Sequence, residues 1–457
     1  MSETTSVTRL YGSDEGPDEQ RRAFLAGRVP VGVYGLGKMG LPLAAVFADV
    51  CRSVIGVDVD PAVVAATNAG RSHVDHEPGL DDLVERTVER GALSAVGDPA
   101  VAAREAVVHV VVVPTLLTRE NAPDLSALET TLSAVASGLR RGDLVVVEST
   151  VPPLTCRDDA LPLLEAESGL SRGEFGLGFC PERTQSGRAL ADIRGAYPKV
   201  VGGVDEESAR AAALVYGEIT DNEVIRVSSA RVAEAVKVFE GVYRDVNIAL
   251  ANELAGYGDR LGVDAREAIA VANTQPFCDI HTPGPGVGGH CIPYYPYFLL
   301  DGNGGELGRL LRTARSVNDG MPKRVVETLS KAIVAEGRSL PGTTVAVLGL
   351  TYRPGIAETR ATPARPIARL LAERGARVLT VDPVLGRAEA SGFHGERVTV
   401  EELHAHDLDA AVLVTAHAEF ETIDWGAFDE LLVVDGRDAL ALDGTGHRVY
   451  TIGRGWS

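Results

Sequence analysis

Lysine is scarce in this 457-residue chain. Only five lysines, at positions 38, 199, 237, 323 and 331, accompany 39 arginines, and the acidic residues bring the formal net charge to -20. So acidic a chain would be repelled by nucleic acid and by anionic membranes, which argues against both as partners. The same composition would suit high intracellular salt, although a GC-rich genome alone also produces an arginine bias.

Cysteine is sparse too, and long apolar runs are missing. The five cysteines form no CxxC pair and no cluster with metal-ligand spacing, so we predict neither a metal site nor a disulfide framework. The longest apolar run, AVVHVVVVPTLL, is too short to span a bilayer and contains His109 and Pro114. The first thirty residues lack the features of a signal peptide. These absences predict a soluble protein of the reducing cytoplasm.

The remaining pattern predicts several domains, because one hydrophobic core rarely serves so long a chain. Residues 1–29 form an acidic leader, expected to be loose apart from one short helix opened by Pro17. Residues 30–225 and 336–457 alternate Val- and Ile-rich runs with helical stretches, which indicates parallel sheets covered on both faces. Residues 226–335 place apolar residues at helical spacing, as one long amphipathic helix or two in sequence, followed by more helix. We predict an α/β protein with two Rossmann-like doubly wound domains joined by a central helical domain.

The strands are expected at short β-branched runs. In the first α/β region these runs are VPVGVYG, SVIGVDV, VVHVVVVP and DLVVVES; in the second they are PGTTVAVLGLTYRPG, ARVLTVDP, DAAVLVTAH and ELLVVDGRD. Long connecting helices with apolar stripes commonly pair between subunits, so a homodimer or a higher homo-oligomer is expected.

A dinucleotide fingerprint lies near the front of the chain. Gly35, Gly37 and Gly40 follow a predicted strand and open a predicted helix, and Asp58 ends the next strand. The first glycine makes the turn, the second admits the pyrophosphate, and the third lets helix and strand pack closely. A carboxylate at Asp58 would bind the ribose 2′-OH and repel a 2′-phosphate, so the cofactor is predicted to be NAD. The predicted cofactor-binding residues are Gly35, Leu36, Gly37, Lys38, Met39, Gly40, Asp58, Pro114, Thr115, Ser149 and Thr150.

The second α/β region has no such fingerprint, so a second dinucleotide site is not expected. Arg353, Arg360 and Arg437 follow strand-like segments, where open parallel sheets bind ligands. Each arginine alone is more simply a solvated surface residue. As a group they indicate a phosphate-bearing substrate, because guanidinium groups bind phosphate in a bidentate manner.

A glycine-rich loop precedes one of the five cysteines. The stretch GPGVGGHC places four glycines and a proline directly before Cys291. Glycine permits tight turns and a close approach of another molecule, whereas a merely structural cysteine needs neither. A free cysteine is also commonly a small buried hydrophobe, and the loop alone does not decide between these roles.

Five motifs in order now resemble one family. ESTVPP, GFCPERTQSGRAL, AEAVKVFEGVYRDVNIALANELA and GPGVGGHC follow the dinucleotide fingerprint over roughly residues 30 to 450. Together they resemble the nucleotide-sugar 6-dehydrogenases of the UDP-glucose/GDP-mannose dehydrogenase family. The PER, RDVNIALANELA and GPGVGGHCIP elements look like the branch that acts on UDP-N-acetylhexosamines, UDP-N-acetyl-D-mannosamine above all.

This resemblance implies a chemistry for Cys291. Oxidation of a sugar CH₂OH to a carboxylate removes four electrons, so two NAD⁺ each accept a hydride. A thiolate holds the intermediate aldehyde as a thiohemiacetal, which loses the second hydride to become a thioester that water hydrolyses. The resemblance makes Cys291 the nucleophile and Lys237 a group for proton transfer or oxyanion stabilisation, with Glu182 and Thr150 orienting a water molecule.

The resemblance also implies a substrate site. His290 is a candidate base for the thiol, although adjacent side chains often point apart and the family does not require it. The predicted substrate-binding residues are Arg183, Lys237, Arg244, Asn247, Gly286, Gly288, Gly289, His290, Tyr295, Arg353 and Arg360.

The chain departs from the family pattern at three positions. Gly241 stands where relatives usually carry Asn, Tyr295 where they usually carry Asp, and Phe277 where many carry an arginine that reaches a neighbouring subunit's substrate. A tyrosine hydroxyl, or Arg244 and Asn247, would have to replace the lost contacts. The same chemistry on UDP-N-acetylglucosamine or UDP-glucose, or a catalytically impaired protein that binds nucleotide sugars, therefore stays open.

Overall fold

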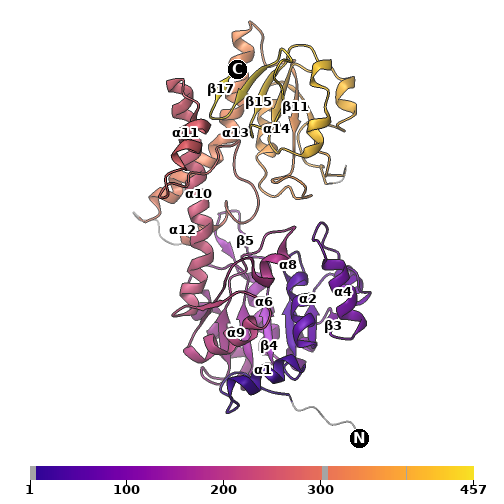
Figure 1. The fold of residues 1–457 in the computed structure, drawn as a ribbon, viewed down its shortest axis with the longest axis vertical. Helices are drawn as coiled ribbons and strands as arrows, with labels where there is room; N and C mark the ends of the chain where they lie inside the picture. Colours follow the sequence, from indigo (N-terminus) through magenta and orange to yellow (C-terminus); the bar gives the residue numbers. More distant parts are fainter. Residues whose placement is uncertain (1–6, 301–306, 387–388) are drawn as a thin grey trace. The chain divides into compact units, whose positions relative to one another are not determined.

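The computed structural model describes residues 7–300, 307–386 and 389–457, which divide into two compact units (Figure 1). Unit 1 contains residues 7–239 and 297–300, and unit 2 contains residues 240–296 and the described residues from 307 onward. In the described part of the chain, every helix is too short or too polar to cross a membrane.

Unit 1 is built on an eight-stranded sheet with the strand order β10-β9-β8-β7-β4-β1-β2-β3. The strands are β1 Val31–Tyr34, β2 Val54–Val57, β3 Leu93–Val96, β4 Val108–Val111, β7 Leu144–Val147, β8 Gly176–Phe179, β9 Lys199–Gly203 and β10 Val224–Arg226. The four strands predicted in this region are therefore confirmed. The sheet is not wholly parallel, because β9 pairs antiparallel with β8.

Helices cover both faces of this sheet, as continuous runs of buried valine require. They are α1 Pro17–Leu25, α2 Gly40–Cys51, α3 Pro61–Asn68, α4 Leu80–Glu89, α5 Pro99–Glu105, α6 Ser126–Ala136, α7 Leu161–Ser168, α8 Ala189–Ala191 and α9 Glu206–Gly217. One core cluster holds buried residues of α1, α2, α4 and α9. The other holds residues of α5, α6, α7 and the start of α10 (Ala230–Leu261). A short hairpin of β5 Leu116–Leu117 and β6 Pro123–Asp124 lies beyond β4.

The acidic leader is packed against this unit. The helix opened by Pro17 is confirmed, but the prediction of a loose segment is wrong for the described residues from 7 onward. Leu10 and Phe24 are fully buried, and Gln20 Nε2 donates a hydrogen bond of 3.0 Å to the Leu10 carbonyl. A few apolar side chains anchor the leader, and its overall polarity concealed them.

The central region is helical, and α10 is a single helix of 32 residues. It is followed by α11 Ala265–Ala272, α12 Tyr295–Leu300 and α13 Arg309–Ala335. Within unit 2, α10 and α13 are joined by buried polar contacts. Asn252 Nδ2 donates to Asn318 Oδ1 at 3.0 Å, and Arg315 donates to Asp245 at 2.5 Å.

The second sheet belongs to unit 2 and has the order β13-β12-β11-β14-β15-β16-β17. The strands are β11 Thr344–Leu348, β12 Arg377–Val381, β13 Glu396–Val398, β14 Ala410–Leu413, β15 Leu432–Asp435, β16 Arg448–Thr451 and β17 Gly455–Trp456. All four strands predicted here are confirmed, and only β17 runs antiparallel to its neighbour. Helices α13 and α14 (Ala364–Glu373) contribute to one core cluster, and short 3₁₀ turns around Leu403, Phe420 and Trp425 contribute to the other.

Candidate active site

The dinucleotide fingerprint folds as three glycines with three different surroundings. Gly35 has φ +96°, and a Cβ there would lie 2.2 Å from the Val112 carbonyl oxygen. A Cβ on Gly40 would lie 1.8 Å from the Gly35 carbonyl oxygen, so the helix packs directly on the turn. A Cβ on Gly37 would meet nothing within 4 Å. This open backbone, directly before the N-terminus of α2, suits a pyrophosphate.

Other predicted cofactor residues surround this turn. Asp58 Oδ2 accepts the Leu36 N–H at 2.9 Å and Oδ1 accepts the Asp60 N–H at 2.9 Å, which leaves lone pairs on both oxygens. The Thr115 hydroxyl is buried without a hydrogen-bond partner among the described residues. Ser149 has a structural task, because its Oγ accepts the Val113 N–H at 2.8 Å. The open glycine, the carboxylate and the unpartnered hydroxyl together fit NAD.

Unit 1 brings Glu182 and Lys237 together. Glu182 lies beyond β8 and Lys237 lies in α10, and Lys237 Nζ is 3.8 Å from Glu182 Oε2. Their side chains are only 18% and 10% exposed, so water screens the pair weakly. Thr184 donates to Glu182 Oε1 through its backbone N–H and its hydroxyl. The same hydroxyl lies 2.8 Å from Met39 Sδ, which joins this segment to the fingerprint turn.

Arg183, predicted to bind substrate, is held by its own segment. Its Nη1 donates to the Pro198 carbonyl at 3.0 Å, and its guanidinium lies 5.1 Å from the centre of the Tyr197 ring. Thr150 follows Ser149 in the same unit. The roles of Arg183 and Thr150 in the active site remain predictions.

Unit 2 holds the glycine loop against the C-terminal sheet. A Cβ on Gly288 would lie 2.6 Å from Tyr352 Cβ, and a Cβ on Gly284 would lie 2.9 Å from Arg437 Nη1. Gly286 and Gly289 have φ +140° and +90°, which other residues rarely adopt. Asn252 Oδ1 of α10 accepts the Gly284 N–H at 2.9 Å. Close packing alone therefore requires these glycines, whatever contact they also make with a substrate.

Cys291 is half-buried at the end of this loop, between two polar side chains. The His290 side chain hydrogen-bonds to Cys291, which raises the pKa of His290 above its ordinary value against the opposing effect of desolvation. Burial and the neighbouring Cys291 both raise the pKa of Tyr352. The two adjacent side chains therefore do interact, and the role of His290 as a base for the thiol remains a prediction.

Two of the three departures from the family pattern, Gly241 and Tyr295, pack against each other in unit 2. A Cβ on Gly241 would lie 2.1 Å from Tyr295 Cδ2, and Tyr295 is 6% exposed. The Tyr295 N–H donates to the Cys291 carbonyl at 3.0 Å, so the ring sits on the turn that follows the cysteine. The absence of a side chain at position 241 is what makes room for Tyr295.

Asn247 and Arg244 lie on α10 beside the segment that precedes the glycine loop. Asn247 Nδ2 donates to the Asp279 carbonyl at 2.6 Å, and its Oδ1 accepts the His281 N–H at 2.8 Å. The charge of Arg244 acts on His281. Asn247 therefore holds the segment around Asp279 and His281 that leads into the glycine loop. Substrate binding by Arg244 and Asn247 remains a prediction.

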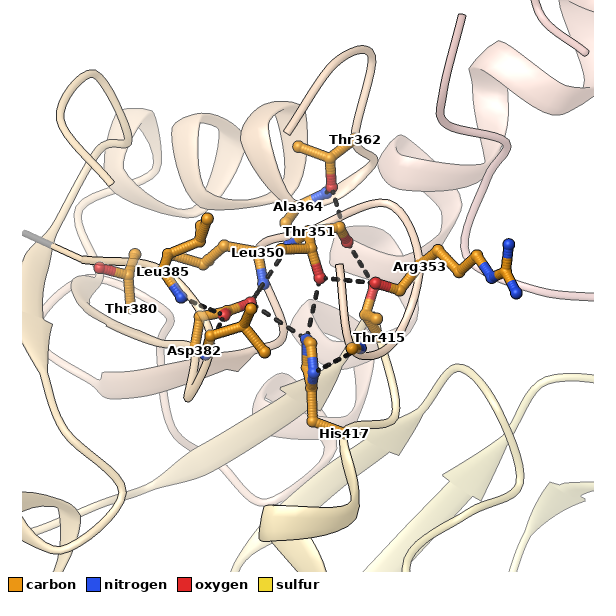
Figure 2. Close-up of polar contacts among 12 residues, drawn as sticks. Leu350, Thr351, Arg353, Thr362, Ala364, Thr380, Asp382, Leu385, Thr415 and His417 are labelled. Atoms are coloured by element: carbon orange, nitrogen blue, oxygen red, sulfur yellow. Dashed lines mark hydrogen bonds and ion pairs between the residues drawn. The ribbon is translucent and has the colours of Figure 1, made fainter. Parts of the chain in front are cut away.

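The turn after β11 is held by a buried network (Figure 2). Asp382 Oδ2 accepts the Leu350 N–H at 2.6 Å and lies 3.2 Å from His417 Nε2, which also contacts Thr351 Oγ1 at 2.9 Å. Figure 2 shows the Arg353 side chain directed away from this network. The Arg360 carbonyl accepts the Gly289 N–H at 2.9 Å, while the Arg360 side chain is exposed.

Arg437 is a poor candidate for the predicted phosphate site. Its Nε donates to the Val414 carbonyl at 2.7 Å, and burial together with the nearby Arg266 lowers the pKa of Arg437 to about 10. Its guanidinium also lies against Gly284. Arg437 therefore supports the glycine loop.

Three residues near the predicted catalytic groups were missed by the sequence analysis. Tyr352 lies beside Cys291, and Glu148 and Lys199 are buried close to Glu182. For Lys199 a signal existed, since it is one of only five lysines. Glu148 directly precedes Ser149 in the quoted ESTVPP motif, but nothing local distinguishes it from a surface carboxylate.

Comparison with known proteins agrees with this geometry. The NAD binding, central and UDP binding domains of the UDP-glucose/GDP-mannose dehydrogenase family match residues 29–220, 231–320 and 346–444. UDP-N-acetyl-D-mannosamine dehydrogenase of Pyrococcus horikoshii is 36% identical over 435 residues, which cover 93% of this chain and 99% of that protein. NDP-N-acetyl-D-galactosaminuronic acid dehydrogenase of Ralstonia solanacearum is 36% identical, covering 89% of this chain and 95% of that protein.

A solved structure is similar throughout the chain as well. The UDP-N-acetyl-D-mannosamine dehydrogenase structure from Pyrococcus horikoshii has a TM-score of 0.85 at 34% identity, and the match covers 93% of this chain and all of that chain. The motifs, the fold and the matched domains thus agree with one another. The chain belongs to the UDP-glucose/GDP-mannose dehydrogenase family and is an NAD-dependent dehydrogenase of nucleotide sugars.

Proposed function

We propose that this enzyme oxidises the C6 hydroxymethyl group of a UDP-N-acetylhexosamine, UDP-N-acetyl-D-mannosamine above all, to the uronate. The observation that carries the proposal is the match, over 93% of the chain, to a UDP-N-acetyl-D-mannosamine dehydrogenase. The reaction consumes two NAD⁺ and one water, and yields two NADH, the carboxylate and about three protons per sugar, two from the oxidations and one from ionisation of the acid. NAD⁺ supplies the hydride acceptor in both oxidations.

Cys291 is the proposed nucleophile. His290 takes the thiol proton, and Sγ then bonds to the aldehyde carbon left by the first oxidation to give a thiohemiacetal. Loss of the second hydride converts this species to a thioester. The glycine loop serves this step by keeping Cys291 half-exposed on a rigid support.

Lys237 and Glu182 are the proposed proton-handling groups. Lysine suits the task because it can release a proton, whereas arginine effectively cannot. Lys237 removes the proton of the C6 hydroxyl or stabilises the oxyanion there, and Glu182 with Thr150 orients the water that hydrolyses the thioester. Their mutual distance of 3.8 Å allows the carboxylate to hold the ammonium group in place.

Arg353 and Arg360 are proposed to bind the diphosphate, and Arg183, Arg244, Asn247, Tyr295 and the glycine loop to shape the sugar site. Arg353 and Arg360 lie in the region that matches a UDP binding domain. The sugar preference depends on a few such side chains. The same chemistry on UDP-N-acetylglucosamine or UDP-glucose is the nearest alternative.

A substrate panel tests the proposed function. The purified protein is incubated with NAD⁺ and each UDP-hexose or UDP-N-acetylhexosamine, and NADH is counted against uronate. We expect two NADH per sugar with UDP-N-acetyl-D-mannosamine, and no release of uronate by Cys291→Ser. A lack of turnover with every UDP-sugar would instead favour a catalytically impaired binding protein.

We also propose that the protein forms at least a homodimer through α10. This helix exposes an apolar stripe of Tyr243, Leu250, Tyr257 and Leu261, each 47% to 68% exposed. Such a stripe at helical spacing is typical of a subunit interface. Light scattering should give at least twice the chain mass for the wild type and a smaller mass for Leu250→Arg. A monomeric wild type would contradict the dimer.

A further inference from the structure

A group of buried titratable side chains lies close to the Glu182–Lys237 pair in unit 1. Glu148, Cys180, Lys199 and Tyr216 come from the end of β7, the end of β8, the start of β9 and helix α9. Their exposed fractions are 1%, 0%, 4% and 0%. The mechanism proposed above uses none of them.

Glu148 in particular is poorly satisfied for a buried carboxyl group. Its Oε1 atom and the Tyr216 hydroxyl have no hydrogen-bond partner within 3.5 Å among the described residues. Tyr216 nevertheless interacts with both Glu148 and Cys180 through weak hydrogen bonds that fall outside this geometry. The positive charge of Lys199 acts on Glu148 and lies 5.9 Å from the centre of the Tyr216 ring.

A second buried carboxylate in the same unit shows what a purely structural one looks like. Glu234 of α10 is also fully buried. Its two oxygens accept the Leu154 and Cys156 N–H groups, each at 2.7 Å, and so tie down a turn. Glu148 holds no comparable backbone group with its side chain among the described residues. A buried polar atom without a partner costs free energy of folding, so stability does not explain why Glu148 occupies this position.

Glu148 is in direct electrostatic contact with the proposed catalytic pair. The charges of both Glu182 and Lys237 act on it, and the Glu182 N–H donates to the Glu148 carbonyl at 3.5 Å. The titratable groups that face Glu148 are therefore Lys199 of β9, Tyr216 of α9, Cys180 and Glu182 beyond β8, and Lys237 of α10. Two of the five lysines of the chain act on this one carboxyl group.

We propose that Glu148 is a positioning residue for the dehydrogenase reaction. When Glu148 gains or loses a proton, the charge next to Glu182 and Lys237 changes. This charge sets how readily Lys237 releases its proton. This inference rests on the proposed roles of Glu182 and Lys237. A protonated Glu148 leaves Lys199 and Lys237 as neighbouring positive charges, which favours proton release from Lys237. An ionised Glu148 adds a negative charge that holds the ammonium form.

The titration range of Glu148 suits this role. The pKa of Glu148 is raised to about 7, chiefly because the carboxyl group is buried; Lys199, Tyr216 and Lys237 oppose the rise, and the charge of Glu182 adds to it. The carboxyl group therefore changes its charge near neutral pH, where a biosynthetic enzyme works. Because the groups interact, they titrate as one coupled set.

The scarcity of lysine makes a direct test practical. Lysine labelled with ¹³C at the ε carbon would give five NMR signals, each assigned by a Lys→Arg variant. In the wild type without substrate, the Lys199 and Lys237 signals should respond to a titration step near pH 7. In Glu148→Gln this step should vanish from both signals. Glu148→Asp should retain the step.

The matched control is Glu234→Gln, which removes another buried carboxylate of unit 1. It should lower thermal stability and leave the titration of Lys237 unchanged. If Lys199 and Lys237 titrate identically in the wild type and in Glu148→Gln, the inference is wrong. Thermal unfolding of each variant, together with the Asp variant, separates this outcome from loss of the fold.

Turnover provides the second readout and separates this inference from the proposed function. If the wild type oxidises a UDP-sugar, the kcat–pH profile should lose a limb near neutral pH in Glu148→Gln and regain it in Glu148→Asp, with KM little changed. An unaltered kcat profile in Glu148→Gln would overturn the positioning role. If the wild type oxidises no UDP-sugar, the proposed function fails, while the lysine titration still decides whether Glu148 and Lys237 are coupled.

Discussion

The first turns of the two sheets begin in the same way. Gly35 and Gly349 follow the first strand of each sheet with φ +96° and +82°, and a Cβ on either would lie 2.2 Å from a carbonyl oxygen of the neighbouring strand's end. In each sheet, an aspartate that follows the next strand accepts the backbone N–H of the residue after this glycine. The Leu36 N–H donates to Asp58 at 2.9 Å, and the Leu350 N–H donates to Asp382 at 2.6 Å.

The two turns differ after this point. In the first sheet the next residue is Gly37, which meets nothing within 4 Å, and Asp58 is only half-buried. In the second sheet the corresponding residue is Thr351, which is fully buried and bonded to His417, and Asp382 is 2% exposed beside the same histidine. The second turn therefore offers no open backbone to a pyrophosphate.

The comparison separates two tasks of a glycine-rich turn. The glycine at positive φ builds the turn in both sheets, whether or not a dinucleotide binds. The open glycine two residues later distinguishes the dinucleotide site from its closed counterpart. His417 holds Thr351, and the next residue, Tyr352, packs against Gly288 and Gly289, so the second turn supports the glycine loop instead.

The largest effect is expected where the two turns are alike. Gly35→Ala and Gly349→Ala should each destabilise their own unit by at least about 3 kcal/mol, because each adds a clash to an unfavourable φ. Hydrogen exchange followed by mass spectrometry would locate the change, to peptides of β1 and β2 in the first variant and of β11 and β12 in the second. Wild-type stability in either variant would show that the two glycines do not have the same role in their turns.

The next effect is expected where the two turns differ. Gly37→Val should leave stability nearly unchanged, because the Cβ position is open. It should weaken NAD⁺ binding by about 100-fold, or roughly 3 kcal/mol, since the side chain would occupy the path of the pyrophosphate. Calorimetry with NAD⁺ and with UDP would check this, and UDP binding should persist. Undiminished NAD⁺ affinity would mean that the open glycine is not the binding surface.

A smaller effect is expected from the closing histidine. Burial alone would raise the pKa of Asp382, but the hydrogen bond and attraction of His417, with backbone N–H groups, hold it below its ordinary value. A lowered pKa contributes stability that is present above the unfolded-state pKa of about 4 and is lost as pH falls through the folded-state value.

His417→Gln should therefore lower the stability of unit 2 at neutral pH by about 1–2 kcal/mol and start its acid unfolding at a higher pH. Circular dichroism during acid titration would measure this, with exposed His404→Gln as the matched control. An acid midpoint equal to that of the wild type would show that Asp382 does not depend on the histidine.

The sequence was sufficient for features whose parts lie close together along the chain. The Gly35–Gly40 turn, the four strands predicted in each α/β region and the helical character of the central region all depend on local spacing, and the structure confirms them. The packing of the leader was missed, because two apolar residues in an acidic segment give a weak local signal.

Features that need distant segments could not be predicted. Tyr352 meets Cys291 only because the glycine loop folds onto the turn after β11. Lys199 reaches Glu148 because β9 pairs antiparallel with β8, a reversal that the predicted parallel sheet did not include. Even the mutual fit of Gly241 and Tyr295 joins positions 54 residues apart in sequence.

The proposed covalent role of Cys291 can be tested by trapping its adduct with the sugar. Glu182→Gln, mixed with NAD⁺ and UDP-N-acetyl-D-mannosamine, should hydrolyse the thioester slowly enough for intact-protein mass spectrometry to detect it. The expected mass gain is that of a UDP-uronyl group, which peptide mapping should place on Cys291 and which Cys291→Ala should lack. Turnover to uronate with two NADH in Cys291→Ala, and no adduct on Cys291 in Glu182→Gln, would contradict this covalent role.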